Sequence, residues 1–364
     1  MKIICTQENL KIGLQQVARI VGSSSTLPIL NNILLQTENG QLKISATNLE
    51  MGINTLIRCK IEQDGGVCVS AKVLLDLINN LPNENILIET KENDVLVATE
   101  RYQTKIKYLP TEDFPLIPEI DNSSVVEIPS RTLKETIDSV LFAVSTSETQ
   151  PEISGVLFKL ENNILTITTT DRYRLAEMKL PVSTSVSMSV ILPNRSVGEL
   201  SRLLANVDEP INLHISSTQI ALSVNGTYMV TRLIDGQYPE YSQIIPEESG
   251  AVITLERSEF LSALKTSGIF SKGVGSITID YHEDKQTIYI NSSSQGVGES
   301  VIEIPCTIKN GSGSVIMNYR YILDFLVNTT DATLNIHIID DTNPVVFKPK
   351  EKPNYLYLIM PIRL

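Results

Sequence analysis

The sequence predicts an α+β protein built from three copies of one domain, each with two helices packed on antiparallel sheets. Three observations support this prediction. Two separate helix-bearing segments each recur three times, at intervals of 123 to 127 residues. Most of the remaining segments have the alternation and β-branched content of strands. A chain of 364 residues is also too long for one ordinary core. Tandem domains are therefore expected at residues 1–122, 123–247 and 248–364.

Each copy opens with a strand that runs into an amphipathic helix. The three segments are KIICTQENLKIGLQQVARI, VVEIPSRTLKETIDSVLFAV and AVITLERSEFLSALKTSGIF. The matched apolar positions, four residues apart in each copy, are Leu10 and Leu14, Leu133 and Ile137, and Phe260 and Leu264. This spacing places both positions on one helical face, which we expect to pack on a sheet.

A second helix recurs later in each copy, with a basic residue near its start. The segments are VCVSAKVLLDLINNL, VILPNRSVGELSRLLANV and SVIMNYRYILDFLVN. Lys72, Arg195 and Arg320 correspond, at intervals of 123 and 125 residues. In every copy an apolar residue follows two and five positions later, and an acidic residue follows at four. The apolar positions again share one face, so the basic residue is expected near solvent.

The segments between and after the helices read as strands and connectors. LKISATNLEMGI and LTITTTDRYRLA match across the first two copies, with Asn48 against Asp171. ILIET and VLVATE, INLHI and IALSV, and LNIHII and PVVFK have the length and composition of strands. DFPLIP and QYPEYSQIIP close the first two copies and predict extended connectors punctuated by proline.

Composition excludes several classes of protein. No segment approaches the ~18 uninterrupted apolar residues of a membrane span, and the first residues lack a secretory apolar region, so a cytoplasmic location is expected. The four cysteines and three histidines share no ligand spacing, so we expect buried thiols, no metal and no cofactor. A net charge of −12 argues against a protein that coats nucleic acid with its whole surface.

Basic residues on the repeated helices nevertheless allow a local basic surface. A curved array of repeats would collect them on one side, although Glu135, Asp138 and Glu199 keep the field modest. Such a surface suits phosphate contacts that read no sequence. A hydrolase would need clustered carboxylates or an activated nucleophile, and the pairs Asp340–Asp341 and Glu247–Glu248 lie in expected loops. A three-domain interaction scaffold that never encircles DNA is the remaining alternative.

Four motifs carry a resemblance to a known family. They are TLPILNNILL at residues 26–35, TTDRYRLA at 169–176, DGQYPEY at 235–241 and YLIMPIRL at 357–364. With the triplication, they make the whole chain resemble the bacterial DNA sliding clamps, the beta subunits of DNA polymerase III. The resemblance implies a non-enzymatic processivity factor, in which two three-domain crescents form a head-to-tail ring around double-stranded DNA, with the helices lining the hole.

The resemblance also implies which residues serve each contact. Residues facing DNA would be Lys11, Arg19, Lys72, Lys134, Arg195, Arg202, Lys265 and Arg320. At the dimer interface, an edge strand at residues 104–109 would meet the third domain, with Ile269 and Phe270 giving apolar contact and Glu299 and Glu303 pairing with Lys105 and Lys107.

A pocket between the second and third domains is implied for short peptides of partner proteins. Its lining would be Ile153, Thr170, Arg172, Tyr173, Arg174, Leu175, Pro239, Gln243, Ile244, Pro344, Leu358, Met360, Pro361, Ile362 and Arg363. Apolar residues would form the cleft, and Arg174 and Arg363 would hold polar groups of the peptide. The implied partners are the polymerase III catalytic subunit, a clamp loader, and other polymerases and repair proteins.

Two departures from the family pattern concern these contacts. Ser23, Ser24 and Ser25 stand where many members have a basic residue, which weakens the expected loop contact to DNA. Gln150 and Gln243 stand where arginine is common, so the rim of the pocket is expected to be less positive.

Overall fold

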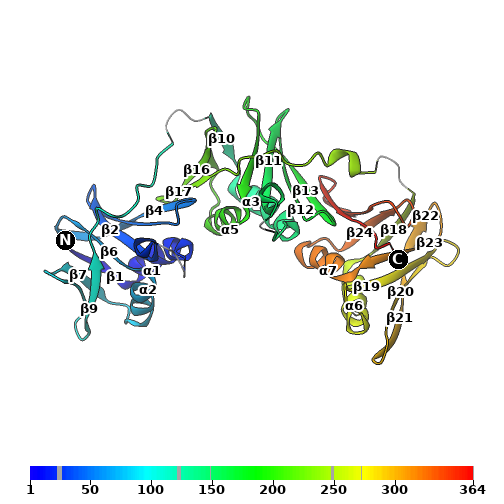
Figure 1. The fold of residues 1–364 in the computed structure, drawn as a ribbon, viewed down its shortest axis with the longest axis horizontal. Coiled ribbons are helices and arrows are strands. Elements are labelled where there is room, and N and C mark those ends of the chain that lie inside the picture. The colour runs from blue at the N-terminus through cyan, green and yellow to red at the C-terminus, as the bar shows by residue number, and fades with distance from the viewer. Residues whose placement is uncertain (23–26, 121–123, 148, 247–249, 272, 364) are drawn as a thin grey trace. The chain divides into compact units, whose positions relative to one another are not determined.

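The computed structural model describes residues 1–22, 27–120, 124–147, 149–246, 250–271 and 273–363 (Figure 1). Its contacts divide the chain into two compact units. The first unit comprises Met1–Arg131 and Arg202–Leu233, and the second comprises Thr132–Ser201 and Ile234–Leu364. The middle repeat therefore contributes strands to both units. The predicted limits at 122/123 and 247/248 fall on residues outside the described part of the chain.

One order of elements recurs three times: strand, helix, three strands, strand, helix, three strands. In the first repeat these are β1 (Lys2–Thr6), α1 (Gln7–Val17), β2 (Asn32–Glu38), β3 (Gln41–Thr47), β4 (Met51–Arg58), β6 (Gly66–Ser70), α2 (Ala71–Asn80), β7 (Asn85–Thr90), β8 (Asp94–Ala98) and β9 (Gln103–Leu109). The short strand β5 (Lys60–Gln63) and the 3₁₀ turns Ala18–Ile20 and Pro28–Asn31 are additions that the sequence patterns did not predict.

The second and third repeats follow the same order. The second contains β10 (Ser124–Ile128), α3 (Ser130–Val140), β11 (Gly155–Glu161), β12 (Ile164–Thr170), β13 (Arg174–Pro181), β14 (Met188–Pro193), α5 (Asn194–Leu203), β15 (Ile211–Ile215), β16 (Gln219–Val224) and β17 (Thr227–Arg232). It adds the 3₁₀ turn Leu141–Ala143 and the short helix α4 (Pro151–Ser154). The third contains β18 (Ala251–Glu256), α6 (Arg257–Ser267), β19 (Ser276–His282), β20 (Thr287–Ser294), β21 (Gly298–Pro305), β23 (Gly313–Asn318), α7 (Tyr319–Asn328), β24 (Thr333–Ile338), β25 (Val345–Pro349) and β26 (Tyr355–Ile359), with β22 (Thr307–Lys309) as an addition.

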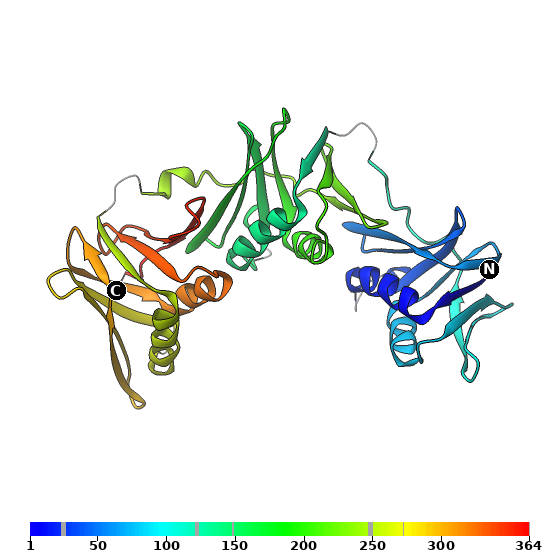
Figure 2. The ribbon, with the colours of Figure 1, turned by 180° about the vertical axis from the view of Figure 1, so that it is seen from behind.

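The helices form where the sequence supplies a cap and an apolar stripe. The Thr6 hydroxyl accepts a hydrogen bond from the backbone N–H of Asn9 at the start of α1, and Ser70 caps α2 in the same way. Leu10 and Leu14 of α1 are fully buried. The Gln7 amide donates to the Ile78 carbonyl at 2.7 Å, so α1 and α2 are held together by a buried polar bond as well as by packing. The helices α6 and α7 likewise lie side by side against strands of the third repeat (Figure 2).

All strand pairs are antiparallel, and the sheets run from one repeat into the next. The first unit holds a 13-stranded sheet in which β4 pairs with β17. The second unit holds a nine-stranded sheet in which β13 pairs with β26, and a four-stranded sheet in the order β21-β20-β19-β23. One rule describes both junctions: the fourth strand of one repeat pairs with the last strand of the following repeat. None of the helices in the described parts of the chain is long and apolar enough to cross a membrane.

Candidate functional site

The second unit contains an apolar cluster on three adjacent strands, where the sequence predicts a peptide cleft. Leu175 of β13, Val346 of β25 and Leu358 of β26 form a cluster whose members are no more than 4% exposed. Partly buried residues pack against this cluster, namely Tyr241, Ile245, Leu356 and Met360. The pairing of β13 with β26, in which Leu175 lies opposite Leu358, brings these residues together. Three predicted pocket residues, Leu175, Leu358 and Met360, therefore meet in one place.

A tight turn between β12 and β13 adjoins this cluster. The Thr170 hydroxyl donates to the Arg174 carbonyl at 2.7 Å and accepts from the backbone N–H of Arg172 at 3.1 Å. The Asp171 carboxylate accepts from the backbone N–H groups of Tyr173 and Arg174, both at 3.0 Å. Arg172 and Tyr173 are both exposed, Tyr173 to 58%, and Arg172 has a φ of 78°. The backbone N–H of Met360 donates to the Tyr173 carbonyl at 2.8 Å, which ties the turn to the C-terminal strand.

Arg174 is committed to the chain itself rather than open to a ligand. Its Nε donates to Asp171 at 2.9 Å, Nη1 to Asp324 of α7 at 2.5 Å, and Nη2 to the Phe142 carbonyl at 3.1 Å. The guanidinium also lies over the Tyr321 ring, 4.6 Å from its centroid. The role of Arg174 as a holder of peptide polar groups stays a prediction, and in the single chain three of its N–H groups already fasten the second repeat to α7 and to the β12–β13 turn.

The surroundings of Arg174 keep its guanidinium charged. Burial by itself would lower the pKa of Arg174. Interaction with the Tyr357 hydroxyl and with the carboxylates of Asp324 and Asp171 outweighs burial and raises the pKa above its ordinary value. The side chain of Arg174 is 11% exposed and that of Asp171 17%, so this pair is shielded from solvent more than a surface ion pair.

A polar network fastens the connector between the second and third repeats to the sheet. The Tyr241 hydroxyl donates its proton to the buried Glu177 carboxylate at 2.5 Å. The Thr168 hydroxyl lies 2.9 Å from the Tyr241 hydroxyl and therefore donates to it. The Tyr238 hydroxyl donates to the Thr168 carbonyl at 3.4 Å. Burial, which is the largest cause, raises the pKa of both tyrosines above the ordinary value.

The sequence patterns did not single out Tyr238, Tyr241, Val346 or Asp324 as site residues. The only available signal was the DGQYPEY motif, which contains both tyrosines of the connector. A hollow of about 800 Å³ lies beside this connector, lined by residues 236–242 together with residues of β11 and β14. Pro239 is the one predicted pocket residue that lines it.

The remaining predicted pocket residues occupy several environments. Ile153 is buried in α4. The exposed residues are Pro239, Gln243, Ile244 and Arg363, and the half-buried ones are Pro344, Pro361 and Ile362. The backbone N–H of Ile362 donates to the Ile316 carbonyl of β23 at 2.8 Å, so the C-terminal segment is fastened within the third repeat. The amide Oε1 of Gln150 is buried and has no hydrogen-bond partner among the described residues.

The predicted DNA-facing residues lie on or beside the repeated helices. Lys72, Arg195 and Arg320 are each exposed and each is the second residue of its helix. Lys265 is exposed in the last turn of α6, Lys11 is half-buried in α1, and Arg19 is exposed just beyond α1. Ser23, Ser24 and Ser25 lie outside the described residues.

Lys134 and Arg202 have structural partners within the chain. Lys134 pairs with Asp138 one turn later on α3. Arg202 donates to the Gln16 carbonyl of α1 at 2.8 Å. Gln16 also accepts hydrogen bonds from Thr55 and Thr227 at 2.7 and 2.8 Å, so Arg202 forms part of the junction between the first and second repeats.

The predicted dimer-interface residues lie on two strands and a turn. In β9, Lys105 and Lys107 are exposed, and Lys107 pairs with Asp94 at 2.7 Å. The strand is not a simple edge, because Tyr108 and Leu109 pair with β6, but residues 103–107 pair with β8 alone within the described chain. Glu299 and Glu303 are exposed on β21, an outer strand of its sheet. Ile269 is 68% exposed in the turn after α6.

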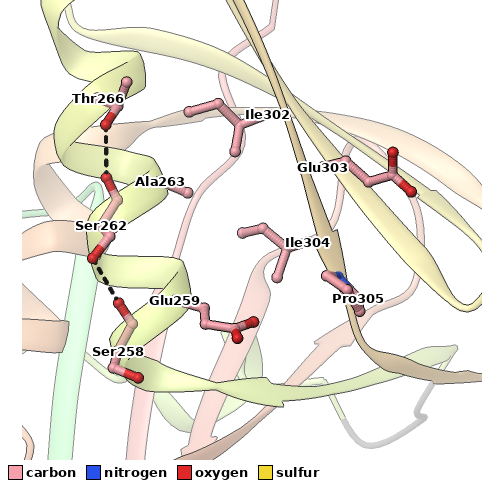
Figure 3. A pocket seen from close by; sticks show the side chains of 9 residues that line it. All are labelled: Ser258, Glu259, Ser262, Ala263, Thr266, Ile302, Glu303, Ile304 and Pro305. Carbon is pink, nitrogen blue, oxygen red and sulfur yellow. Dashed lines mark hydrogen bonds between the residues drawn. The ribbon is translucent and has the colours of Figure 1, made fainter.

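A groove of about 570 Å³ runs between α6 and β21 (Figure 3). Ser262, Ala263 and Thr266 form its helical wall, and Ile302 and Ile304 project toward the helix from the strand. Glu303 projects from the opposite side of β21. The groove therefore lies on the helix side of the strand, beside an open sheet edge. Within the described residues no cluster of three or more acidic, histidine or cysteine side chains could hold a metal ion.

Comparison with known proteins identifies this architecture. Family models of the DNA polymerase III beta subunit match the chain in sequence order: the N-terminal domain over residues 1–118, the central domain over 127–240 and the C-terminal domain over 242–363. A beta sliding clamp of Synechococcus elongatus is 28% identical over 375 residues and covers 100% of both chains. One from Staphylococcus aureus is 25% identical over 361 residues, covering 96% of each.

Solved structures agree with these relatives. The sliding clamp of Bacillus subtilis superposes with a TM-score of 0.95 at 26% identity, covering 100% of this chain and 99% of that one. A Pseudomonas aeruginosa sliding clamp bound to griselimycin gives 0.95 at 25% identity, with 100% coverage of both. The fold is thus the three-domain α+β clamp fold, as the sequence predicted. The chain belongs to the family of DNA polymerase III beta subunits.

Proposed function

We propose that this chain is a non-enzymatic processivity factor: two copies close head-to-tail into a ring around double-stranded DNA, and partner proteins are tethered through the cleft of the second unit. The observation that carries this proposal is the junction rule. The fourth strand of a repeat, β4 or β13, pairs with the last strand of the following repeat. Two strands remain to which the rule gives no partner within one chain: β21 of the third repeat and β9 of the first repeat. In a head-to-tail dimer, β21 of one copy would pair with β9 of the other. Such a contact removes open sheet edges when it closes into a ring.

The register of this contact follows from the two junctions within the chain. Ile53 lies opposite Met229 in the first junction, and Ala176 lies opposite Tyr357 in the second. Counting residues through the strand pairings of each repeat, Ser300 of β21 corresponds to Ile53 and Ala176, and Thr104 of β9 corresponds to Met229 and Tyr357. In an antiparallel ladder this register puts Glu299 opposite Lys105 and Glu303 opposite Arg101 of the second copy. Lys107, already paired with Asp94, would face Val297 instead of Glu303.

Shape supports the same register. In this register Ile302 of β21 would face Tyr102 of the second copy. The Tyr102 side chain is 52% exposed in the single chain. Ile302 lines the groove between α6 and β21, so Tyr102 would fill that groove beside Ala263 and Thr266. A buried aromatic anchor in a preformed hollow is typical of the energetically dominant residues of an interface.

Contacts to DNA are proposed to come from the repeated helices. A cation in the first turn of a helix opposes the helix dipole, at a cost of a few tenths of a kcal/mol. Lys72, Arg195 and Arg320 occupy this unfavourable position in all three repeats. Helix stability does not explain that recurrence, but binding of phosphate does, because the helix N-terminus and the basic side chain both attract an anion. The contacts read no sequence, so the ring would slide.

A tether explains how such a protein acts on replication. A polymerase catalytic subunit bound to the cleft stays at high effective concentration near the primer end, so dissociation is followed by rebinding. Competing polymerases, repair proteins and a clamp loader would use the same apolar cleft, where Met360 adapts to different side chains. The chain has no P-loop, so energy for ring opening would come from the loader. Domain limits at residues 122 and 247 and a cytoplasmic location remain part of this proposal; the family matches at 1–118, 127–240 and 242–363 support a first limit between 118 and 127 and a second near 241.

Retention on circular DNA under salt challenge tests the proposal. Labelled protein is loaded on nicked circular DNA by the cognate loader, moved to 0.5–1 M salt, and followed with and without linearisation of the DNA. If phosphate contacts alone held the protein, its affinity for DNA would fall by orders of magnitude over this range of salt concentration. Retention on circles, with rapid loss after cutting, supports encirclement. Equal loss from circular and linear DNA would refute it and favour a scaffold that never encircles DNA. Sedimentation of the free protein should give about twice 40.3 kDa.

A further inference from the structure

The first unit contains a second cleft, at the junction between the first and second repeats. It has a volume of about 200 Å³ and lies between the β3–β4 turn, the connector that follows β9, and strands β16 and β17. Its lining residues are Thr47, Leu49, Glu50, Met51, Gly52, Leu116, Pro118, Gln219, Val230, Thr231 and Arg232. The volume is below the ~300–1,000 Å³ of typical small-molecule sites, so it suits one large side chain of a peptide.

This cleft repeats the construction of the first one bond by bond. The Thr47 hydroxyl donates to the Met51 carbonyl at 3.0 Å and accepts from Leu49 at 3.1 Å, as Thr170 does with Arg174 and Arg172. The Asn48 side chain accepts hydrogen bonds from the backbone N–H groups of Glu50 and Met51, at 3.0 and 2.8 Å. The Asp171 carboxylate accepts from Tyr173 and Arg174 in the same way. The backbone N–H of Arg232 donates to the Glu50 carbonyl at 2.8 Å, which matches the bond from Met360 to Tyr173.

Backbone strain marks both turns. Leu49 has a φ of 75° and Arg172 a φ of 78°, although neither residue is glycine or asparagine. A bulky side chain in this left-handed region costs about 1–3 kcal/mol, and such strain concentrates at binding sites. In both turns the strained residue presents an outward side chain at the mouth of the cleft: Leu49 is 46% exposed, and Arg172 is exposed as well.

The two clefts differ in the chemistry of their walls. Leu49 and Met51 stand where the other cleft has Arg172 and Arg174. Leu116 of the connector is 96% exposed at the mouth. Ile117 covers Gly52 so closely that a Cβ at residue 52 would lie 2.6 Å from the Cγ2 of Ile117. The strained turn and the connector therefore present aliphatic side chains to this cleft, and Glu50 and Arg232 are its charged lining residues.

We propose that this junction is a second peptide-binding cleft, which takes an extended, uncharged segment of a partner protein through one bulky aliphatic or aromatic side chain. The inference rests on the proposed function, since the cleft of the second unit supplies the model for its occupant. Leu49 and Leu116 are exposed beside a hollow of about one side chain's size, and they would contact the apolar side chain of the partner. The lack of arginines in the strained turn makes its preference differ from that of the other cleft, so two partners can occupy one chain at the same time.

Methionine methyl resonances can report each cleft separately in the full-length protein. The chain has seven methionines, of which Met51 lines the second cleft and Met360 packs in the first. Protein labelled at the methionine methyl carbons is titrated with the peptide acetyl-GSLFSG-amide, whose aromatic ring shifts a nearby methyl resonance. The control peptide is acetyl-GSAASG-amide. We expect the Met51 resonance to move in a saturable manner with the first peptide and to stay fixed with the second.

Two variants test whether the movement arises at this cleft. Leu116→Ser alters a side chain that is almost fully exposed, and Leu49→Asn places a residue that tolerates positive φ. Each should weaken the Met51 titration about tenfold and leave the Met360 titration unchanged. Ile164→Ser, an exposed aliphatic residue outside both clefts, is the matched control and should change neither.

Every combination of outcomes separates the two hypotheses. Movement of Met360 with a fixed Met51 overturns the second cleft and leaves the proposed function intact. Movement of Met51 with a fixed Met360 supports the second cleft and the difference in preference between the two sites. A Met51 shift that persists in both leucine variants also overturns the inference, because binding then occurs elsewhere. No movement of either methyl refutes both peptide sites.

Discussion

Replacing Arg174 by alanine should loosen the fastening between the second repeat and α7 in the second unit. The variant loses three hydrogen bonds, at 2.9 Å to Asp171, 2.5 Å to Asp324 and 3.1 Å to the Phe142 carbonyl. It also loses the stacking over Tyr321. No other described basic side chain forms an ion pair with Asp171 or Asp324. The mutation therefore affects stability and the shape of the cleft together.

The magnitude follows from how exposed each partner is. Removing one partner of a fully buried pair costs about 3–5 kcal/mol. Asp324 is 46% exposed and regains water, and Asp171 keeps the backbone hydrogen bonds from Tyr173 and residue 174, so the cost is smaller. With ~0.5–1 kcal/mol for the lost cation–π contact, we expect a total of about 2–3 kcal/mol. For a unit of about 200 residues this lowers Tm by roughly 5–10 °C.

Scanning calorimetry of the full-length protein measures this change. Arg172→Ala is the matched control, because Arg172 lies in the same turn but is exposed, and it should change stability by less than about 0.5 kcal/mol. Arg174→Lys keeps the charge without the forked geometry and should fall between the two. If Arg174→Ala and Arg172→Ala melt at the same temperature, Arg174 does not fasten the two repeats and the reasoning is refuted.

Three further predictions address the interface, acid stability and the thiols. Glu299→Lys should weaken dimerisation about tenfold to a thousandfold, since a ring contains the contact with Lys105 twice. Adding Lys105→Glu should restore it in sedimentation equilibrium, and failure to restore it would refute the register. Hydrogen bonds from the following turn lower the pKa of Asp340 to about 2, so its stabilisation is complete above about pH 4 and lost as pH falls through 2. Thermal melts from pH 5 to pH 2 should therefore show a smaller loss for Asp340→Asn than for the unmodified chain, and parallel curves would contradict this. Burial raises the pKa of Cys5 and Cys68 to about 12, so both should react with a thiol reagent at pH 8 only after unfolding, and rapid reaction of the native chain would disprove their burial.

The triplication could be predicted because its signals are local. Leu10 and Leu14, like Leu133 and Ile137, lie four residues apart, so a period of 3.6 reveals the helix without knowledge of its partner. The strands were visible in the same way from alternation and β-branched residues. The additions β5, β22 and α4 were missed because they are only three or four residues long, too short for a periodic pattern.

The candidate site could be predicted only in part. Leu175, Leu358 and Met360 were named through motifs, and the structure places them around one apolar floor. The partner of Arg174 was missed, because Asp324 lies 150 residues away and no local pattern connects the two. The register of β9 was likewise out of reach, since its pairing with β6 at Tyr108 and Leu109 depends on how the sheet closes.

By itself, the sequence determined three tandem copies of a two-helix unit, their strands, and the recurrence of a basic residue at the start of one helix. Tertiary structure alone decided that the fourth strand of one repeat pairs with the last strand of the next, that Arg174 joins the second repeat to α7, and that the β3–β4 turn repeats the hydrogen bonds of the β12–β13 turn. The division has a physical reason. Helix and strand formation depends on neighbours within a few residues, whereas junctions depend on contacts between residues more than a hundred positions apart, whose partners are fixed only when the sheets are assembled.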